Sequence, residues 1–299
     1  MKINQTDYVL EIGSGNNPRP RSDILCDRWI EDDMERGGNI VRDRPIIEAD
    51  AQDLPFRDSA FDYVICAQVL EHVDDPERMI RELMRVASRG YIETPTEVAE
   101  WLYGWPFHRS VVNLLDGKLV IRRKDFTPPF GELFHVLSER DQTFRRFHLT
   151  HNRLLMVQYE WEGRIDYEIL PSGTSALDLR SPEVVERLVR DIAGASLKDR
   201  WMPALKSLIP RSVAAWGKSS LARARPRQRR DLRDIIVCPR CKGPVVWESQ
   251  QISCSRCSIE YPITRGIPRL SFQESPTDTA TAGKWAVPHW IPVGGRERD

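Results

Sequence analysis

The fold is decided by the stretch Tyr-Val-Leu-Glu-Ile-Gly-Ser-Gly at residues 8–15. Its first five residues suit a buried strand, and the two glycines that follow let the backbone turn sharply and approach a ligand closely. Similar apolar runs recur downstream at 23–26, 45–49, 61–67 and 89–93. Apolar strands separated by crossovers are typical of a parallel sheet covered on both faces. The sequence therefore predicts an α/β, doubly wound domain.

One helix is predicted between the last two of these strands. Asp75 can cap its start, Pro76 suits its first turn, and Gly90 follows its end. Apolar residues recur between them at helical spacing, namely Met79, Ile80, Leu83, Met84 and Ala87.

Beyond residue 96 the pattern changes. A short helix is predicted at 97–102 and a strand at 118–122. Two further strands, 154–161 and 165–170, flank a Glu-Gly pair at 162–163 that suits a hairpin turn. We therefore expect a substrate or lid region after the fifth strand.

Acidic or amide side chains follow three of the predicted strands. Asp27 ends the second strand, Asp50 and Ala51 end the third, and the fourth runs into Gln68. Because the carboxyl ends of parallel strands meet at one edge of a sheet, these residues should share one crevice. A carboxylate such as Asp27 can hold two ribose hydroxyls, and Asp50 with the Ala51 amide can bind an adenine edge. The pattern therefore predicts a nucleoside-containing cofactor.

The length of the connection between Gly15 and Asp27 argues against one class of nucleoside-containing cofactor, the dinucleotides. It contains Asn-Asn-Pro-Arg-Pro at 16–20 and is too short for a full helix. A dinucleotide enzyme normally places a phosphate-binding helix and a third glycine here. The sequence therefore argues against pyrophosphate binding.

The order of these motifs resembles that of the class I S-adenosylmethionine (SAM)-dependent methyltransferases, in particular methyltransferase type 11-like proteins. The matching stretches are VLEIGSG (9–15), ADAQDLPF (49–56), FDYVICAQVLEHVDDPERMIRELMRV (61–86) and GYIETP (90–95), within a resemblance that spans about residues 7–110. The resemblance implies a Rossmann-like sheet with SAM as cofactor. It also implies a set of cofactor-binding residues: Glu11, Gly13 and Gly15 around the methionine part, Asp27 at the ribose, Asp50 and Ala51 at the adenine, and Gln68 beneath the cofactor.

Two histidines are candidates for a catalytic role. SAM supplies the leaving group, so the protein has to align the acceptor and, where the acceptor is a hydroxyl, remove its proton. Histidine is the natural base near neutral pH, and His72 follows the fourth strand whereas His108 follows the fifth. We favour His108, because nearby aromatic residues could form an apolar pocket around it, and we expect no catalytic metal. These aromatics, which could instead pack as lid or core, are Trp101, Tyr103, Trp105 and Phe107.

Two features of the sequence around residues 67–73 indicate which class of molecule accepts the methyl group. Enzymes that methylate amide or adenine nitrogens usually carry an Asn/Asp-Pro-Pro-aromatic run after the fourth strand, and this chain has AQVLEH at 67–72. The surroundings of LEHV (70–73) resemble families that methylate small molecules, lipids or sugars. We therefore expect transfer to an oxygen or nitrogen of a small molecule or glycan precursor. Two alternatives stay open, namely methylation of RNA or a protein, and a non-catalytic adaptor.

Four cysteines form a second motif. Cys238, Cys241, Cys254 and Cys257 have the spacing C-x2-C-x12-C-x2-C. Four thiolates at such spacing can bind zinc tetrahedrally and leave no open position, which makes the ion structural. The segment that ends in YPITRGIPRL (261–270) resembles Trm112-like zinc ribbons, whose members bind and activate methyltransferases that act on tRNA, rRNA or proteins. A fused copy implies that the ribbon docks on, or recruits substrate to, its own catalytic domain.

These predictions divide the chain into four parts. Residues 1–175 are expected to form the methyltransferase domain, 176–232 a helical and basic linker, 233–272 the zinc ribbon and 273–299 a disordered tail. The 44 basic side chains balance the 44 acidic ones, which argues against binding nucleic acid by bulk charge. The basic stretch 218–233 could still contact RNA, or serve as a solvated linker. No apolar run is long enough to span a membrane and no signal peptide is apparent, so we expect a cytoplasmic protein.

Overall fold

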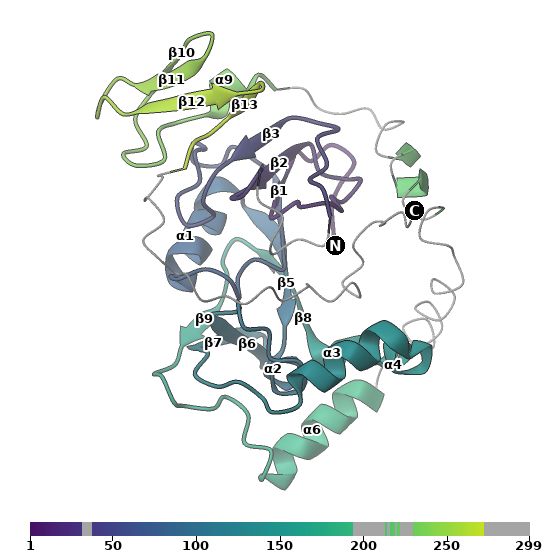
Figure 1. Cartoon of the computed structure of the whole chain (residues 1–299). Helices are drawn as coiled ribbons and strands as arrows, with labels where there is room; N and C mark the ends of the chain where they lie inside the picture. The colour runs from purple at the N-terminus through teal and green to yellow at the C-terminus, as the bar shows by residue number, and fades with distance from the viewer. Residues whose placement is uncertain (32–37, 194–212, 214–215, 219, 222–229, 272–299) are drawn as a thin grey trace.

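A six-stranded sheet forms the centre of the computed structural model (Figure 1). The structure describes residues 1–31, 38–193, 213, 216–218, 220–221 and 230–271. The sheet has the order β3-β2-β1-β4-β5-β8 and is parallel except for the edge strand β8, which runs antiparallel to β5. Its strands are β1 (Val9–Ile12), β2 (Ile24–Asp27), β3 (Ile46–Glu48), β4 (Tyr63–Ala67), β5 (Arg89–Pro95) and β8 (Met156–Glu162). This order confirms the predicted doubly wound α/β fold and reverses between β1 and β4.

Among the described residues, one crossover between the parallel strands contains a helix. This helix, α1 (Pro76–Val86), joins β4 to β5, and the Asp75 side chain caps it by accepting from the Arg78 N–H. None of the described helices is long and apolar enough to cross a membrane. The other described helices before residue 194 follow β5. They are α2 (Glu97–Leu102), α3 (Gly131–Arg140), α4 (Gln142–Thr150), α5 (Asn152–Leu155) and α6 (Pro182–Ala193).

The structure corrects the predicted hairpin at residues 162–163. β8 pairs with β5 along the whole of both strands, whereas β9 (Tyr167–Ile169) pairs in parallel with β7 (Lys118–Arg123). Gly163 donates its N–H to Ser88 O at 2.7 Å, so the end of β8 stays bound beside β5 and the chain leaves for another sheet. That sheet has the order β6-β7-β9 and includes β6 (Ser110–Leu115), which the sequence analysis does not predict.

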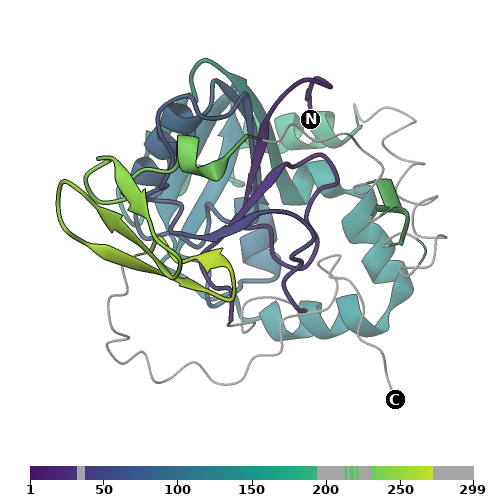
Figure 2. The same ribbon diagram turned by 90° about the horizontal axis from the view of Figure 1, so that it is seen from above.

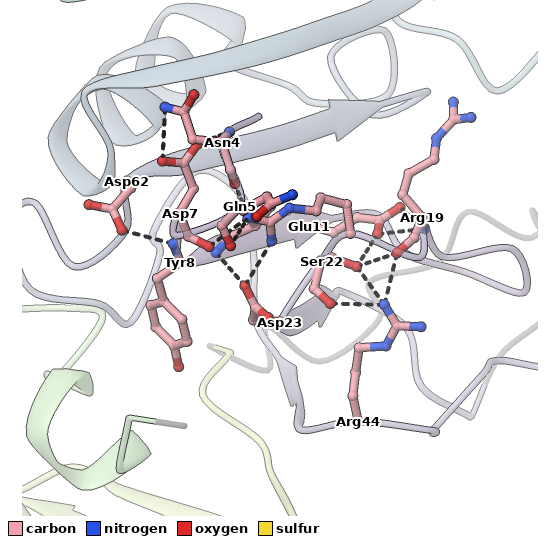
Figure 3. A network of polar contacts seen from close by, with 12 residues as sticks. Asn4, Gln5, Asp7, Tyr8, Glu11, Arg19, Ser22, Asp23, Arg44 and Asp62 are labelled. Atoms are coloured by element: carbon pink, nitrogen blue, oxygen red, sulfur yellow. Dashed lines mark hydrogen bonds and ion pairs between the residues drawn. The ribbon is translucent and has the colours of Figure 1, made fainter. Parts of the chain in front are cut away.

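Buried polar contacts hold the Pro-rich connection against β1 (Figure 3). The Glu11 carboxylate accepts the backbone N–H of Arg19 at 2.8 Å and the hydroxyl of Ser22 at 2.6 Å. The Arg44 guanidinium in turn donates to the Ser22 hydroxyl at 2.9 Å and to Arg19 O at 2.8 Å. Because no helix joins β1 to β2, these hydrogen bonds fix the path of the connection.

A four-stranded antiparallel sheet forms the C-terminal part of the structure. In Figures 1 and 2 it lies beside the main sheet, on the side opposite to the helices that follow β5. It begins with the short helix α9 (Leu232–Ile235) and contains β10 (Val245–Trp247), β11 (Gln251–Cys254), β12 (Glu260–Thr264) and β13 (Ile267–Pro268). Most of the predicted linker after residue 193 and the predicted tail from 273 lie outside the described residues.

Backbone hydrogen bonds at both ends of the C-terminal sheet join it to the main domain. Val237 donates its N–H to Pro55 O at 2.9 Å, and Leu270 donates to Glu48 O, at the end of β3, at 2.7 Å. The buried apolar side chains of the two parts form one continuous cluster. The C-terminal sheet therefore covers the β3 edge, where a free strand would expose unpaired backbone groups.

One lysine connects the C-terminal sheet to α1. Lys242 Nζ lies 2.8 Å from Glu82 Oε2 and donates to Leu54 O at 3.1 Å. Arg85 Nε lies 2.6 Å from the other Glu82 oxygen. Burial alone would raise the pKa of Glu82, but the hydrogen bonds from Arg85 and Lys242 hold that pKa below its ordinary value.

We expect Lys242→Met and Glu82→Gln to be coupled in their effects on stability, because the two side chains bind each other across a partly buried interface. A double-mutant cycle, measured by urea unfolding of the zinc-loaded protein, should give a coupling free energy of about 1 kcal/mol. The exposed pair Lys118 and Glu168, 3.4 Å apart, is the matched control and should give about 0.3 kcal/mol or less. Equal coupling in the two pairs would contradict the interface.

Candidate functional site

The loop after β1 has a backbone conformation that requires glycine. Gly13 and Gly15 have φ of 66° and 51°, in the left-handed region that other residues rarely adopt. A Cβ on Gly13 would lie 2.2 Å from Val69 Cγ2, so this loop packs directly against the loop after β4. The Ser14 hydroxyl and the Asn16 amide nitrogen are buried with no hydrogen-bond partner among the described residues. Such groups suit a polar ligand that supplies the missing partners.

The ends of β2 and β3 lie beside this loop. The Asp27 carboxylate accepts the Gly15 N–H at 2.9 Å. Asp50 and the buried Ala51 follow β3, the strand next to β2. Arg28 Nε lies 3.4 Å from Asp50 Oδ2, a contact that the sequence pattern does not indicate. The structure thus places the predicted ribose and adenine residues along one edge of the sheet.

Gln68 lies where β4 ends, next to β5. Its φ is 58°, and its N–H donates to Glu93 O at 2.8 Å. The Glu93 carboxylate accepts the Tyr91 hydroxyl at 2.6 Å and lies 3.3 Å from Arg19 Nη2. Because Arg19 belongs to the Pro-rich connection, this ion pair links the β1 side of the edge to β5. No local sequence signal predicts it, since the two residues meet only through the fold.

A buried network surrounds His108. Its Nδ1 lies 2.5 Å from Glu100 Oε1, and the other Glu100 oxygen lies 2.6 Å from Lys124 Nζ. Burial lowers the pKa of His108, and the nearby Glu100 carboxylate opposes this shift. The contact with Glu100 fixes the ring and leaves Nε2 as the nitrogen that can act. The sequence analysis does not identify Glu100 or Lys124, because α2 and the chain after β7 bring them to His108 only in the fold.

His72 and Glu71 lie beside His108. The centroid of the His72 ring is 4.7 Å from that of His108, and the His72 ring stacks on Phe107 at 5.5 Å. Burial lowers the pKa of His72 well below its ordinary value and raises the pKa of Glu71 to about 8. Glu71, His72 and His108 each offer one coordinating atom, and these three atoms lie within 4.8 Å of one another. The predicted catalytic histidines are therefore neighbours, and the Glu71 carboxylate lies beside them.

The aromatic residues before His108 have different surroundings. Trp105 stacks on the His108 ring with centroids 4.9 Å apart, and Phe107 meets its edge at 5.0 Å. Tyr103 and Trp105 are buried in a cluster with Leu155, while Phe107 is partly buried. Trp105 and Phe107 thus line the histidines, and Tyr103 packs behind them as core.

The four cysteines of the C-terminal sheet come together. The Cys238 and Cys257 sulfurs are 3.6 Å apart, and those of Cys241 and Cys254 are 3.4 Å apart. These distances exceed the ~2.05 Å of a disulfide. They are close to the ~3.8 Å between thiolates around a tetrahedral zinc ion with bonds of ~2.3 Å. The four thiols therefore fit a structural zinc ion.

Two parts of the chain match protein families. Residues 31–92 match a family described as a methyltransferase domain, and residues 229–266 match the Trm112p-like proteins. A UPF0434 protein of Methylobacillus flagellatus is 46% identical over 46 residues, which make up 15% of this chain and 77% of that protein. The chain joins a type 11 methyltransferase domain to a Trm112p-like domain. Both resemblances noted in the sequence are confirmed.

Three other similar proteins each match only part of this chain. Norajmaline N-methyltransferase of Rauvolfia serpentina is 49% identical over 41 residues, which make up 14% of this chain and 14% of that enzyme. The YcgJ protein of Bacillus subtilis is 24% identical with a TM-score of 0.27, over 32% of this chain and 47% of that one. The complex of the Haloferax volcanii Trm112 methyltransferase activator with a methyltransferase gives 20% identity and a TM-score of 0.27, over 34% of this chain and 52% of that one.

We expect Glu11→Gln to remove a pH dependence of stability in the methyltransferase domain. Burial raises the folded-state pKa of Glu11 from 4.5 to about 7. Its protonated form therefore contributes stability below the unfolded pKa, and that contribution is lost as the pH rises through about 7. The unfolding free energy of wild type minus that of the variant should fall by about 2 kcal/mol between about pH 5 and pH 8. The exposed Glu168→Gln is the control, and a constant difference for Glu11→Gln would refute the shift.

We expect the purified chain to hold one zinc ion in the Trm112p-like domain. Cys254→Ser should lose it and lower the melting temperature of the whole chain by about 5 °C or more, because the two domains share one core. Cys66→Ala, a buried cysteine outside the cluster, should keep its zinc. Metal analysis and calorimetry measure both quantities. Full zinc content in Cys254→Ser would contradict the assignment.

Proposed function

We propose that the protein transfers a methyl group from SAM to an oxygen or nitrogen atom of a small molecule or glycan precursor. The main support is the edge of the sheet where the glycine loop, the ends of β2 and β3 and the loop after β4 adjoin. Open α/β sheets bind ligands at this edge, beside the point where the strand order reverses. The match to a methyltransferase domain supports SAM as that ligand.

The proposed cofactor contacts follow the order of the strands. The unpartnered Ser14 hydroxyl and Asn16 amide offer hydrogen bonds to the polar groups of methionine, and Glu11 holds their loop in place. Each remaining role is assigned to the end of one strand. Gly13 and Gly15 surround the methionine part, Gln68 lies beneath the cofactor, Asp27 binds the ribose hydroxyls, and Asp50 with Ala51 binds the adenine.

We further propose that His108 and His72 activate the acceptor. SAM, when bound, supplies a methyl group on a sulfonium that is an excellent leaving group. Glu100 fixes the His108 ring and Phe107 stacks on His72, so both imidazoles are held in set orientations. His108 is 7% exposed. A group at that depth is reached by a small acceptor more readily than by a folded macromolecule, which supports the small-molecule class.

A second candidate, methylation of RNA, is favoured by a cleft between the two domains. It has a volume of about 650 Å³, and arginines line it together with Trp247. Arginine suits phosphate groups. However, Glu31 pairs with Arg265 at 2.8 Å and Asp62 lies 3.7 Å from Arg230, so acidic partners already offset part of this charge. We therefore rank RNA second.

Calorimetric titration with SAM tests the proposal. The zinc-loaded wild type should bind SAM at one site, and Asp27→Ala should weaken binding about tenfold or more, because it removes the ribose carboxylate and the acceptor of the Gly15 N–H. The matched control is Asp116→Asn, in the exposed turn between β6 and β7, which should bind as wild type does. A folded, zinc-loaded wild type that binds no SAM would contradict the proposal and favour the adaptor.

Labelled SAM distinguishes the acceptor classes. With cell extract as the source of acceptors, label should appear in material that resists RNase and protease. Label that is released by RNase would support the RNA alternative, and label released by protease a protein substrate. Either of these results would overturn the small-molecule assignment.

A further inference from the structure

A carboxylate lies beside the two histidines, in the loop after β4. Glu71 directly precedes His72, and the N–H groups of Arg109 and Ser110 donate to Glu71 O at 2.7 Å and 3.1 Å. These hydrogen bonds tie the segment that carries His108 to the loop after β4. The spacing of the three coordinating atoms, all within 4.8 Å, is therefore set by the backbone.

The Glu71 carboxylate is buried, but within the described part of the chain only one of its two oxygens has a side-chain hydrogen-bond partner. Its side chain is 1% exposed, and Oε2 accepts the Thr94 hydroxyl at 3.0 Å. Oε1 has no hydrogen-bond partner among the described residues. The negative charges of Glu100 and Glu93 add to the effect of burial and raise the pKa of this carboxyl further. A buried carboxylate oxygen without a donor is costly, and a cation beside it would remove that cost.

His108 has the outer contact that is typical of a metal-binding imidazole. Histidine ligands usually donate their second ring N–H to a carboxylate, which fixes the tautomer and orients the ring. Glu100 Oε1, 2.5 Å from His108 Nδ1, occupies this position. Lys124, 2.6 Å from the other Glu100 oxygen, holds that carboxylate in turn.

We propose that Glu71, His72 and His108 bind a divalent first-row transition-metal ion. Two imidazoles and one carboxylate suit Mn²⁺, Fe²⁺, Co²⁺ or Zn²⁺ better than Ca²⁺ or Mg²⁺, which take oxygen ligands. Three protein ligands leave coordination positions open for a further ligand. From the sequence alone we expect no catalytic metal, because the two histidines are candidates for a base.

Binding of the ion depends only on these three side chains. The role of the ion in activating an acceptor rests on the proposed methyl transfer. An imidazole can activate an acceptor by taking its proton or by holding a cation that polarises it. The unpaired oxygen of the buried Glu71, close to both histidines, favours the second, because a cation would give that oxygen a partner. A hydroxyl beside a divalent ion is more acidic than in water. The site therefore selects an oxygen acceptor over a nitrogen acceptor.

Cobalt(II) is the probe that tests the site. The full chain is first loaded with one equivalent of zinc, so that the cysteine cluster is filled and the histidine site is left for the probe, and is then titrated with Co²⁺. One Co²⁺ per chain should bind while the zinc is retained. The absorption should show the ligand-field bands of a nitrogen and oxygen site without the intense sulfur-to-cobalt band of a cysteine site. Glu71→Gln and His108→Asn should each weaken this binding about tenfold or more.

The matched control is His151→Asn at the end of α4, which should bind Co²⁺ as wild type does. SAM titration of each variant reports whether the cofactor site has folded. A wild type that takes up no Co²⁺ beyond the cysteine cluster would overturn the site, and so would equal Co²⁺ binding by all three variants. SAM binding without Co²⁺ binding refutes the site alone. Co²⁺ binding without SAM binding supports the site and refutes the proposed methyl transfer.

Discussion

The cover over the β3 edge is the contact on which the rest of the structure depends. An exposed edge strand leaves backbone groups unpaired, and in this chain Leu270 donates to Glu48 O there while the Trm112p-like domain adds its core to that of the main sheet. No helix joins β1 to β2, so this cover supports the same half of the sheet as the hydrogen bonds of the Pro-rich connection. β2 ends at Asp27, and β3 ends at Glu48, two residues before Asp50. Residues far along the sequence, folded around four cysteines, thus help to position the proposed cofactor contacts.

The parts of the fold that could be predicted have local causes. The strands of the main sheet are short apolar runs buried on both faces, and the cysteine cluster follows from spacing alone. The position of β8 could not be read from its own residues, because its partner β5 is far away in the sequence. β6 did carry a usable signal. Asp116 and Gly117, with φ of 50° and 81°, form the tight turn between β6 and β7, and Asp-Gly between two strand-like runs indicates such a hairpin.

The candidate site shows the same division. The glycine loop and the residues at the strand ends belong to short motifs, so they can be proposed from the sequence. The groups that set the chemistry of the histidines cannot, because Glu100, Lys124 and Thr94 reach Glu71 and His108 from three different segments. Their contribution is electrostatic and depends on burial. Which side chain is charged, and which oxygen lacks a partner, is a property of the assembled structure.

The fusion of the two domains changes what their interface has to achieve. Two separate proteins must lose translational freedom to associate, and their contact has to compensate for that loss. In one chain the contact forms at the high effective concentration that covalent linkage provides. An interface that combines backbone hydrogen bonds, the Lys242 contact with Glu82 and a shared apolar core can then stay closed at any dilution. The ratio of the two domains is also fixed at one to one, so the supply of a separate Trm112p-like subunit cannot limit the number of complete molecules.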